Sequence, residues 1–174
     1  MTIRTTEKKF NVKKLVIASI LSALVVLATA FIAFPTGHGG YLNLGDGVVL
    51  ASAYLLGPWG MAVAAIGSGL ADVLGGYFIY APATAIIKAA MAGVAWLFFR
   101  SEQNKYAWLR LGVGIVLAEG IMVLGYFGFE CAVLGWTAAS AAVLPNLFQA
   151  GGGVMVSTLL LGMARRMGWK NQIG

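Results

Sequence analysis

Apolar runs, each close to the length of a membrane-spanning helix, follow one another along this chain of 174 residues. Hydrophobic residues make up 60% of the chain and charged residues only 10%, whereas an average soluble domain has roughly 25% charged residues. One helical crossing of the hydrocarbon core takes about 20 residues, so the chain can supply about six crossings with short loops. The sequence therefore predicts an all-α integral membrane protein with one membrane domain over residues 1–174.

Proline and glycine mark the ends of these runs, because proline cannot continue a hydrogen-bonded helix and glycine favours turns. Pro35 follows the first run, Gly57-Pro58 separates the second from the third, and Pro82 precedes the fourth. The last loop is expected from Glu130 to Trp136. The first run is longer than a signal-peptide core and no cleavage motif closes it, so we expect a retained helix. The six predicted helices cover residues 14–34, 44–56, 59–74, 83–99, 109–129 and 137–163.

Basic residues flank these helices on one side only. Lys and Arg concentrate in cytoplasmic segments, so the six-helix arrangement predicts that both termini are cytoplasmic. Five or seven helices would scatter the same residues over both sides. The net charge of +6 is then explained by residues that set the membrane topology and contact anionic lipid headgroups. No nucleic-acid partner is expected. Eleven of the twelve basic residues follow this pattern: Arg4, Lys8, Lys9, Lys13, Lys14, Arg100, Lys105, Arg110, Arg165, Arg166 and Lys170.

The motifs of common enzymes and of nucleotide-binding loops are missing. The sequence has no GxxxxGK[ST], HExxH or GxSxG pattern, and His38 has no paired nucleophile. The single cysteine, Cys131, excludes an internal disulfide and has no His or Cys neighbour at ligand spacing. We expect neither a metal site nor a cofactor bound by this chain.

Three ionisable residues are predicted at membrane depth near the non-basic side: Lys88, Asp72 and Asp46. A charge in lipid is costly unless it faces a partner or a cavity. One interpretation is a structural Lys88–Asp72 salt bridge between neighbouring helices. The other is a polar pocket that opens outward, in which Lys88 donates to a ligand and an acid supplies the counter-charge.

The fifth helix supports a pocket, because Glu119, Met122, Tyr126 and Glu130 recur at helical spacing and share one face. Glu119 lies near mid-membrane and Glu130 near the outer rim, where it could be only solvated. On the sixth helix, the amides of Asn146 and Gln149 require hydrogen-bond partners, from a ligand or from another helix. Aromatic side chains in the outer loops serve either as interfacial anchors or as a stacking surface for a flat ring. The predicted substrate-binding residues are Asn43, Asp46, Asp72, Tyr80, Lys88, Tyr126, Glu130, Asn146 and Gln149.

Small residues on the first helix form a smooth face. Ala18 with Ser22, and Ser19 with Ala23, are two small-xxx-small pairs, a pattern that allows close approach of another helix. This face serves either packing within the bundle or docking of a partner protein.

Taken together, the residues resemble the substrate-binding S components of energy-coupling factor (ECF) transporters, which import vitamins into prokaryotes. The resemblance covers nearly the whole chain, although the first helix has serines where the family often has alanines. It looks like the branch for hydroxymethylpyrimidine or pyridoxine. The segments that carry it are 42–46, 57–60, 71–72, 75–77, 80–84 with Lys88, 122–127 with Glu130, and Pro145-Asn146 with Gln149.

The resemblance implies a multi-pass subunit of the prokaryotic cell membrane that captures a small vitamin from outside. A transmembrane coupling protein and two ABC-type ATPases would drive its release inside, so ATP is used by the partners. Alternatives are an S component for another vitamin such as riboflavin, an autonomous proton-coupled carrier, or a small intramembrane enzyme using Glu119 and Lys88.

Overall fold

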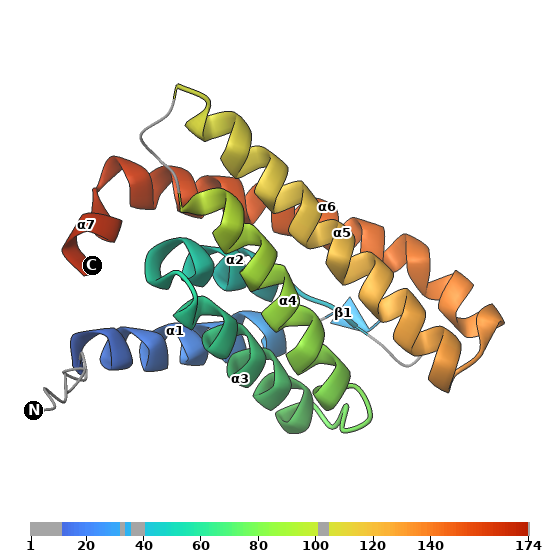
Figure 1. Ribbon diagram of the computed structural model, residues 1–174. Coiled ribbons are helices and arrows are strands. Elements are labelled where there is room, and N and C mark those ends of the chain that lie inside the picture. Colours follow the sequence, from blue (N-terminus) through green and yellow to red (C-terminus); the bar gives the residue numbers. More distant parts are fainter. Residues whose placement is uncertain (1–11, 32–33, 36–40, 101–104, 174) are drawn as a thin grey trace, which may run out of the picture.

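The computed structural model describes residues 12–31, 34–35, 41–100 and 105–173. These residues form helices and one two-stranded hairpin, as Figure 1 shows. The hairpin pairs β1 (Phe34–Pro35) antiparallel with β2 (Tyr41–Leu42). The helices are α1 (Val12–Ala30), α2 (Gly45–Leu56), α3 (Trp59–Leu74), α4 (Ala81–Phe99), α5 (Ala107–Val133), α6 (Trp136–Arg166) and α7 (Trp169–Ile173).

Four of these helices, α1, α4, α5 and α6, are long and apolar enough to cross a membrane. The helices α2 and α3 are also apolar but shorter, with 12 and 16 residues. Many apolar side chains point outward, for example Ile86, Leu124 and Leu159, which are 72%, 71% and 62% exposed. Such a surface suits lipid rather than water. The expectation of an all-helical membrane bundle is thus confirmed, and the six crossings remain a prediction.

The short helix α2 lies at the centre of the bundle. It packs against α1, α3, α4 and α6, and ten of its 12 residues are buried. A helix that is apolar on all sides needs such a position. The turn into α3 depends on Gly57, whose φ of +62° is a backbone conformation that other residues avoid.

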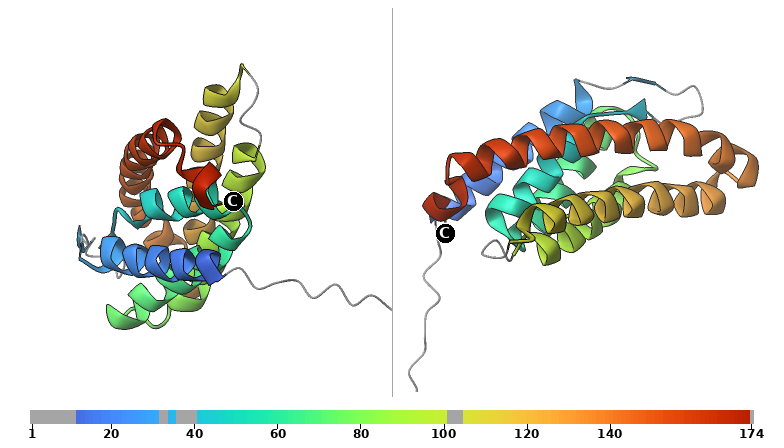
Figure 2. Two further views of the ribbon diagram at one scale, coloured as in Figure 1. Left: turned by 90° about the vertical axis from the view of Figure 1, so that its left-hand side faces the viewer. Right: turned by 90° about the horizontal axis from the view of Figure 1, so that it is seen from above.

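Around α2, the other helices pack one against another: α1 on α3, α3 on α4, α4 on α5, and α5 on α6. Figure 2 shows α5 and α6 extending together beyond the rest of the bundle at one end. The described residues at the other end carry the basic side chains, and the start of α1 and the helix α7 lie there (Figure 1). We call it the basic end; it holds Lys13, Lys14, Arg100, Lys105, Arg110, Arg165, Arg166 and Lys170.

Several predicted helix ends were wrong. The first helix ends at Ala30 rather than Phe34, because the chain turns into the hairpin. Helix α4 includes Pro82 in its first turn, where the missing N–H of proline costs no helical hydrogen bond. Helix α5 continues to Val133, so Glu130 is helical, and only two residues separate α5 from α6. The last helix, α7, was not predicted.

Candidate functional site

A buried ion pair joins α2 to α4 in the interior of the bundle. The Lys88 ammonium donates to Oδ1 of Asp46, and the two side chains are 1% and 0% exposed. The second carboxylate oxygen of Asp46 accepts a hydrogen bond of 2.8 Å from Nε2 of Gln149, on α6. Because Asp46 bonds to both neighbours, three helices are held together at one point.

The amide of Gln149 extends this network to the start of α2. Its oxygen accepts hydrogen bonds from the backbone N–H of Asn43, at 3.1 Å, and from Nδ2 of Asn43, at 3.3 Å. The Asn43 side-chain oxygen in turn accepts from the backbone N–H of Gly45, at 2.9 Å. Asparagine favours this local bond at the entry to a helix. The polar network of Asn43, Asp46, Lys88 and Gln149 is therefore largely satisfied by its own members.

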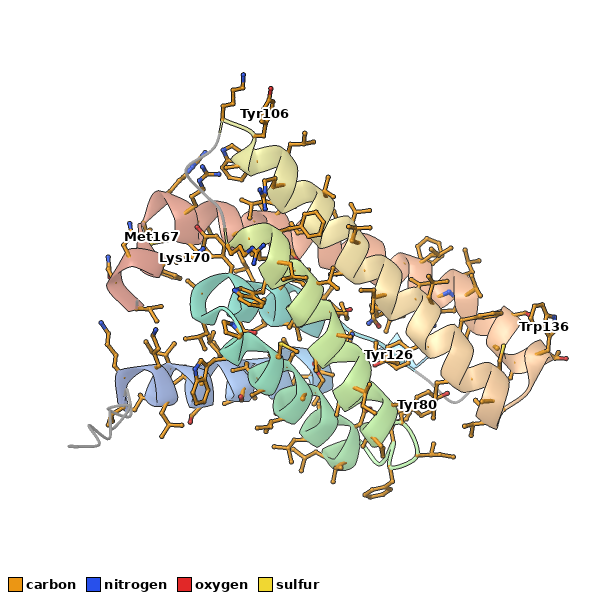
Figure 3. All side chains as sticks on the ribbon, in the orientation of Figure 1. Tyr80, Tyr106, Tyr126, Trp136, Met167 and Lys170 are labelled. Atoms are coloured by element: carbon orange, nitrogen blue, oxygen red, sulfur yellow. The ribbon has the colours of Figure 1, made fainter. Side chains whose placement is uncertain are left out.

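Further toward the non-basic end, the polar faces of α4 and α5 meet. The hydroxyls of Thr84 and Tyr126 are 3.0 Å apart, and the Lys88 ammonium lies 5.5 Å from the centroid of the Tyr126 ring. One turn higher, the Tyr80 hydroxyl donates to Oε1 of Glu130 at 3.4 Å. Figure 3 shows Tyr80 and Tyr126 on the side of the bundle away from Tyr106 and Lys170. We call Tyr80, Thr84, Tyr126 and Glu130 the outer tier.

The outer tier contains one buried acceptor that lacks a donor among the described residues. Glu130 is 5% exposed, and its Oε2 has no hydrogen-bond partner. Burial, followed by the nearby charge of Glu130, raises the pKa of Tyr80 to about 12. Tyr80 therefore keeps its proton at physiological pH and remains a donor. The edges of the Phe129 and Tyr77 rings fix its ring, with centroids at 5.2 and 6.5 Å.

Two further predicted site residues are Asp72, whose charge acts on Tyr80, and Asn146. Asp72 is 2% exposed, but Lys88 pairs with Asp46 and not, as one of the two interpretations had it, with Asp72. The physical reason is that α2 runs through the middle of the bundle and presents Asp46 directly to α4. Asn146 is half-buried one turn before Gln149, and its side chain makes no hydrogen bond with the described residues.

A further buried carboxyl, that of Glu119, lies deeper on α5. It is 2% exposed, and neither of its oxygens has a hydrogen-bond partner among the described residues. The carboxyl packs on Gly153 of α6, where an added Cβ would overlap Oε1 of Glu119. It is close enough to Asp46 and Lys88 to feel their charges. Within the described residues, no cluster of three or more His, Cys, Asp or Glu side chains could hold a metal ion.

The small-residue face of α1 borders a groove between α1 and α3, with a volume of about 600 Å³. Ala18, Ser19, Ser22 and Ala23 all line it. Ala18 is only 9% exposed and belongs to the core, whereas Ser19 and Ala23 are exposed. The face therefore takes part in internal packing at Ala18 and remains open at Ser19 and Ala23.

Residues 9–166 match the family described as the S component of the ECF-type riboflavin transporter. The chain belongs to the ECF S components. A Pyrococcus woesei protein, described as an uncharacterized protein in the gap 3′ region, is 32% identical over 134 residues, which are 76% of this chain and 88% of that protein. A solved structure titled "Structure and mechanism of the S component of a bacterial ECF transporter" has the same fold. Its TM-score is 0.64 at 22% identity, covering 91% of this chain and 97% of that one.

As an S component, the protein is a multi-pass membrane subunit of a transporter and not an enzyme. Membership implies a vitamin as substrate and, as partner, the ECF module, the name used here for the coupling protein with its ATPases. The resemblance to S components is thus confirmed at the level of the family. The family description names riboflavin rather than hydroxymethylpyrimidine or pyridoxine.

Sequence analysis did not include Thr84 or Glu119 in the predicted site of this S component. Thr84 follows Tyr80 and precedes Lys88 at four-residue spacing, so helical periodicity could have placed it on the same face. Glu119 was recognised as a buried acid but was not included, and its contact with Gly153 is visible only in the structure.

Proposed function

We propose that this S component binds riboflavin at the outer tier and delivers it inward together with the ECF module. The observation that carries the proposal is the buried Oε2 of Glu130, which lacks a donor beside the Tyr80 hydroxyl. An unsatisfied buried acceptor is costly, and a ligand that donates a hydrogen bond there removes the cost. Riboflavin offers an imide N–H and several hydroxyls, and its flat ring system suits aromatic neighbours.

The choice of vitamin rests on the family description together with this geometry. Hydroxymethylpyrimidine and pyridoxine also carry hydroxyl donors, and the residue pattern pointed to them. The family model that matches residues 9–166 names riboflavin, so riboflavin takes precedence. In this proposal the substrate-contacting residues are Tyr80, Tyr126 and Glu130, with Asn146 at the edge. The network of Asn43, Asp46, Lys88 and Gln149 supports them from below, and Asp72 of α3 is close enough for its charge to act on Tyr80.

The ion pair has a role in transport as well. The proposed orientation places the basic end in the cytoplasm, so the outer tier faces outside. Release of the vitamin inside requires the pocket to change sides. A charge that moves through lipid is costly unless it is neutralised, and Lys88 and Asp46 neutralise each other in any orientation of the bundle. The open part of the α1/α3 groove, at Ser19 and Ala23, is the proposed docking face for the coupling protein.

Titration of purified protein with riboflavin, pyridoxine and hydroxymethylpyrimidine tests the proposal. We expect riboflavin to bind most tightly. Glu130→Gln and Tyr80→Phe should each weaken binding about tenfold to hundredfold, the loss typical of one hydrogen bond involving a charged group. Lys105→Gln, an exposed change at the basic end, is the control and should bind like wild type.

Two results would contradict the proposal. Tight binding of pyridoxine or hydroxymethylpyrimidine with no binding of riboflavin would restore the substrate that the residue pattern predicted. Riboflavin uptake by vesicles that contain this chain alone would instead indicate an autonomous carrier.

A further inference from the structure

A second groove runs along the lipid-facing side of the bundle. It lies between α1 and α6, with α2 as its floor and α7 at one end, and its volume is about 530 Å³. Leu24 and Ala28 form part of one wall, Leu160 part of the other, Ala51 part of the floor, and Trp169 closes the end. All eleven residues that line it are apolar.

The groove follows from the helix lengths. Both α1 and α6 pack on α2, but α2 has only 12 residues while α6 has 31. The two long helices therefore extend past their short common neighbour and leave the space between them open to the bilayer. An apolar space many times the ~30 Å³ share of one water molecule stays dry, so it has to be filled by lipid or by protein.

The residues of the groove favour a flexible chain over a helix. The α1/α3 groove presents Ser19, Ser22 and Ala23, which let a helix backbone approach closely. The α1/α6 groove presents Leu21, Leu24 and Phe31 from the same helix. Their bulk holds a helix backbone away, whereas a lipid acyl chain can pass between them.

The charge at one end of the groove indicates the headgroup. Trp169 and Ala164 lie at the basic end, and the Lys13 ammonium donates to the backbone carbonyl of Gln172, on α7. An ammonium has three hydrogens, so Lys13 can bind a further acceptor. Arg166, on the last turn of α6, is exposed. The acidic residues that the structure describes are buried away from this end: Asp46, Asp72, Glu119 and Glu130.

We propose that this groove binds one anionic phospholipid of the cytoplasmic leaflet. One acyl chain lies between α1 and α6, and the phosphate is held near Lys13, which is beside α7. The exposed ring of Trp169 lies where the headgroup meets the acyl chains, a position that Trp favours. The choice of leaflet rests on the proposed orientation of the S component, whereas the choice of an anionic headgroup rests on the charges at the groove.

Native mass spectrometry of protein taken from vesicles of equal phosphatidylglycerol and phosphatidylcholine tests the proposal. Wild type should retain one phosphatidylglycerol. Ala28→Trp, which fills the groove, should lose it. Lys13→Gln should lower retention about fivefold, because a cationic side chain near the bilayer surface is removed. Ala28→Leu fills less of the groove and takes the place of Ala28→Trp in the test if the Trp variant does not fold.

Two control variants match these changes. Leu124→Trp adds the same bulk to a side chain of α5 that is 71% exposed and outside the groove, and Lys105→Gln removes an exposed charge of the basic end elsewhere. Both should retain the lipid as wild type does. Riboflavin binding should be unchanged in all of these variants, so a failed lipid test and a failed vitamin test can be told apart.

The outcomes that overturn the proposal are equally specific. If Ala28→Trp keeps the lipid but no longer assembles with the coupling protein, the groove is a protein-docking face. If wild type retains phosphatidylcholine as well as phosphatidylglycerol, or if Lys13→Gln loses nothing, Lys13 does not recognise a phosphate.

Discussion

Lys88 of α4 is paired with Asp46 of α2, and neither side chain is more than 1% exposed. Asp46 also accepts a hydrogen bond from Gln149 of α6, so this pair links three helices in the interior of the bundle. The attraction between two buried charges is offset by the loss of their hydration, and the pair therefore stabilises little by itself. Removing Lys88 alone, and removing both charges together, tests whether the pair matters for folding.

Loss of Lys88 alone should destabilise the fold. Lys88→Met leaves the Asp46 carboxylate buried without its cation, a change that typically costs about 3–5 kcal/mol. Lys88→Met combined with Asp46→Asn should recover most of that loss, because the asparagine is uncharged and keeps an oxygen for Gln149. Thermal unfolding in detergent measures both variants, with Lys105→Met as the exposed control. Wild-type stability of Lys88→Met alone would show that the pair does not matter for folding.

The sequence predicted which polar residues are buried but not how they pair. Helical spacing placed Lys88 within the fourth helix and Glu119 within the fifth, because periodicity is a local property. The partner of Lys88 depends on which helix lies next to α4 at that depth, and this is decided by the central position of α2. Because α3 and α4 are neighbours in the sequence, Asp72 was considered as the partner of Lys88. The packing of α2 against α4 places Asp46 there instead.

Tyr80 should titrate at unusually high pH. Burial and the Glu130 charge raise its pKa to about 12, and both disfavour the phenolate. In Glu130→Gln the charge is gone, so the pKa of Tyr80 should fall toward its ordinary value of about 10. The difference in ultraviolet absorbance between each protein and its Tyr80→Phe counterpart isolates this residue, and circular dichroism verifies that the helices persist. An equal midpoint in both proteins would mean that Glu130 does not influence Tyr80.

A bulky residue in the open part of the α1/α3 groove should block coupling but not binding. Ser19→Phe or Ala23→Phe places a ring where the partner helix has to approach closely. Riboflavin uptake in cells that contain the ECF module should fall, while binding to purified protein should stay unchanged. Leu124→Phe on α5 is the control. Parallel loss of binding and uptake would place Ser19 and Ala23 inside the functional core of the bundle instead.

The helix ends are a second feature that could not be predicted from the local sequence pattern. Glu130 was assigned to a loop because a charge after a long apolar run normally marks the end of a span. In the structure α5 continues past it to Val133, and the Tyr80 hydroxyl donates to the carboxylate inside the bundle. A contact between residues 50 positions apart cannot be read from local pattern.

The proposed orientation predicts which positions can be labelled from outside. The background is Cys131→Ser, which removes the single cysteine. Trp136→Cys, at a position 71% exposed at the non-basic end, should react with a membrane-impermeant maleimide in intact cells. Gln172→Cys, at the basic end, should react only after permeabilisation. The reverse pattern would mean that the protein has the opposite orientation in the membrane, with the outer tier on the cytoplasmic side.

Gly153 should be required for the packing of α5 on α6. A Cβ at this position would overlap the Glu119 carboxyl, and because both residues are buried, neither can turn outward to relieve the clash. Gly153→Ala should therefore destabilise the protein by about 1–3 kcal/mol, as overpacking of a core does.

Gly151→Ala is the matched control on the same helix, because nothing lies within 4 Å of a Cβ built there. Alanine is the better helix former by about 1 kcal/mol, so this variant should be as stable as wild type or more stable. If shape alone causes the effect, Gly153→Ala combined with Glu119→Ala should regain stability, because the shortened side chain makes room for the added methyl. Equal unfolding temperatures for Gly153→Ala and Gly151→Ala would show that α5 and α6 adjust to the methyl group, and that Glu119 is held by something other than this contact.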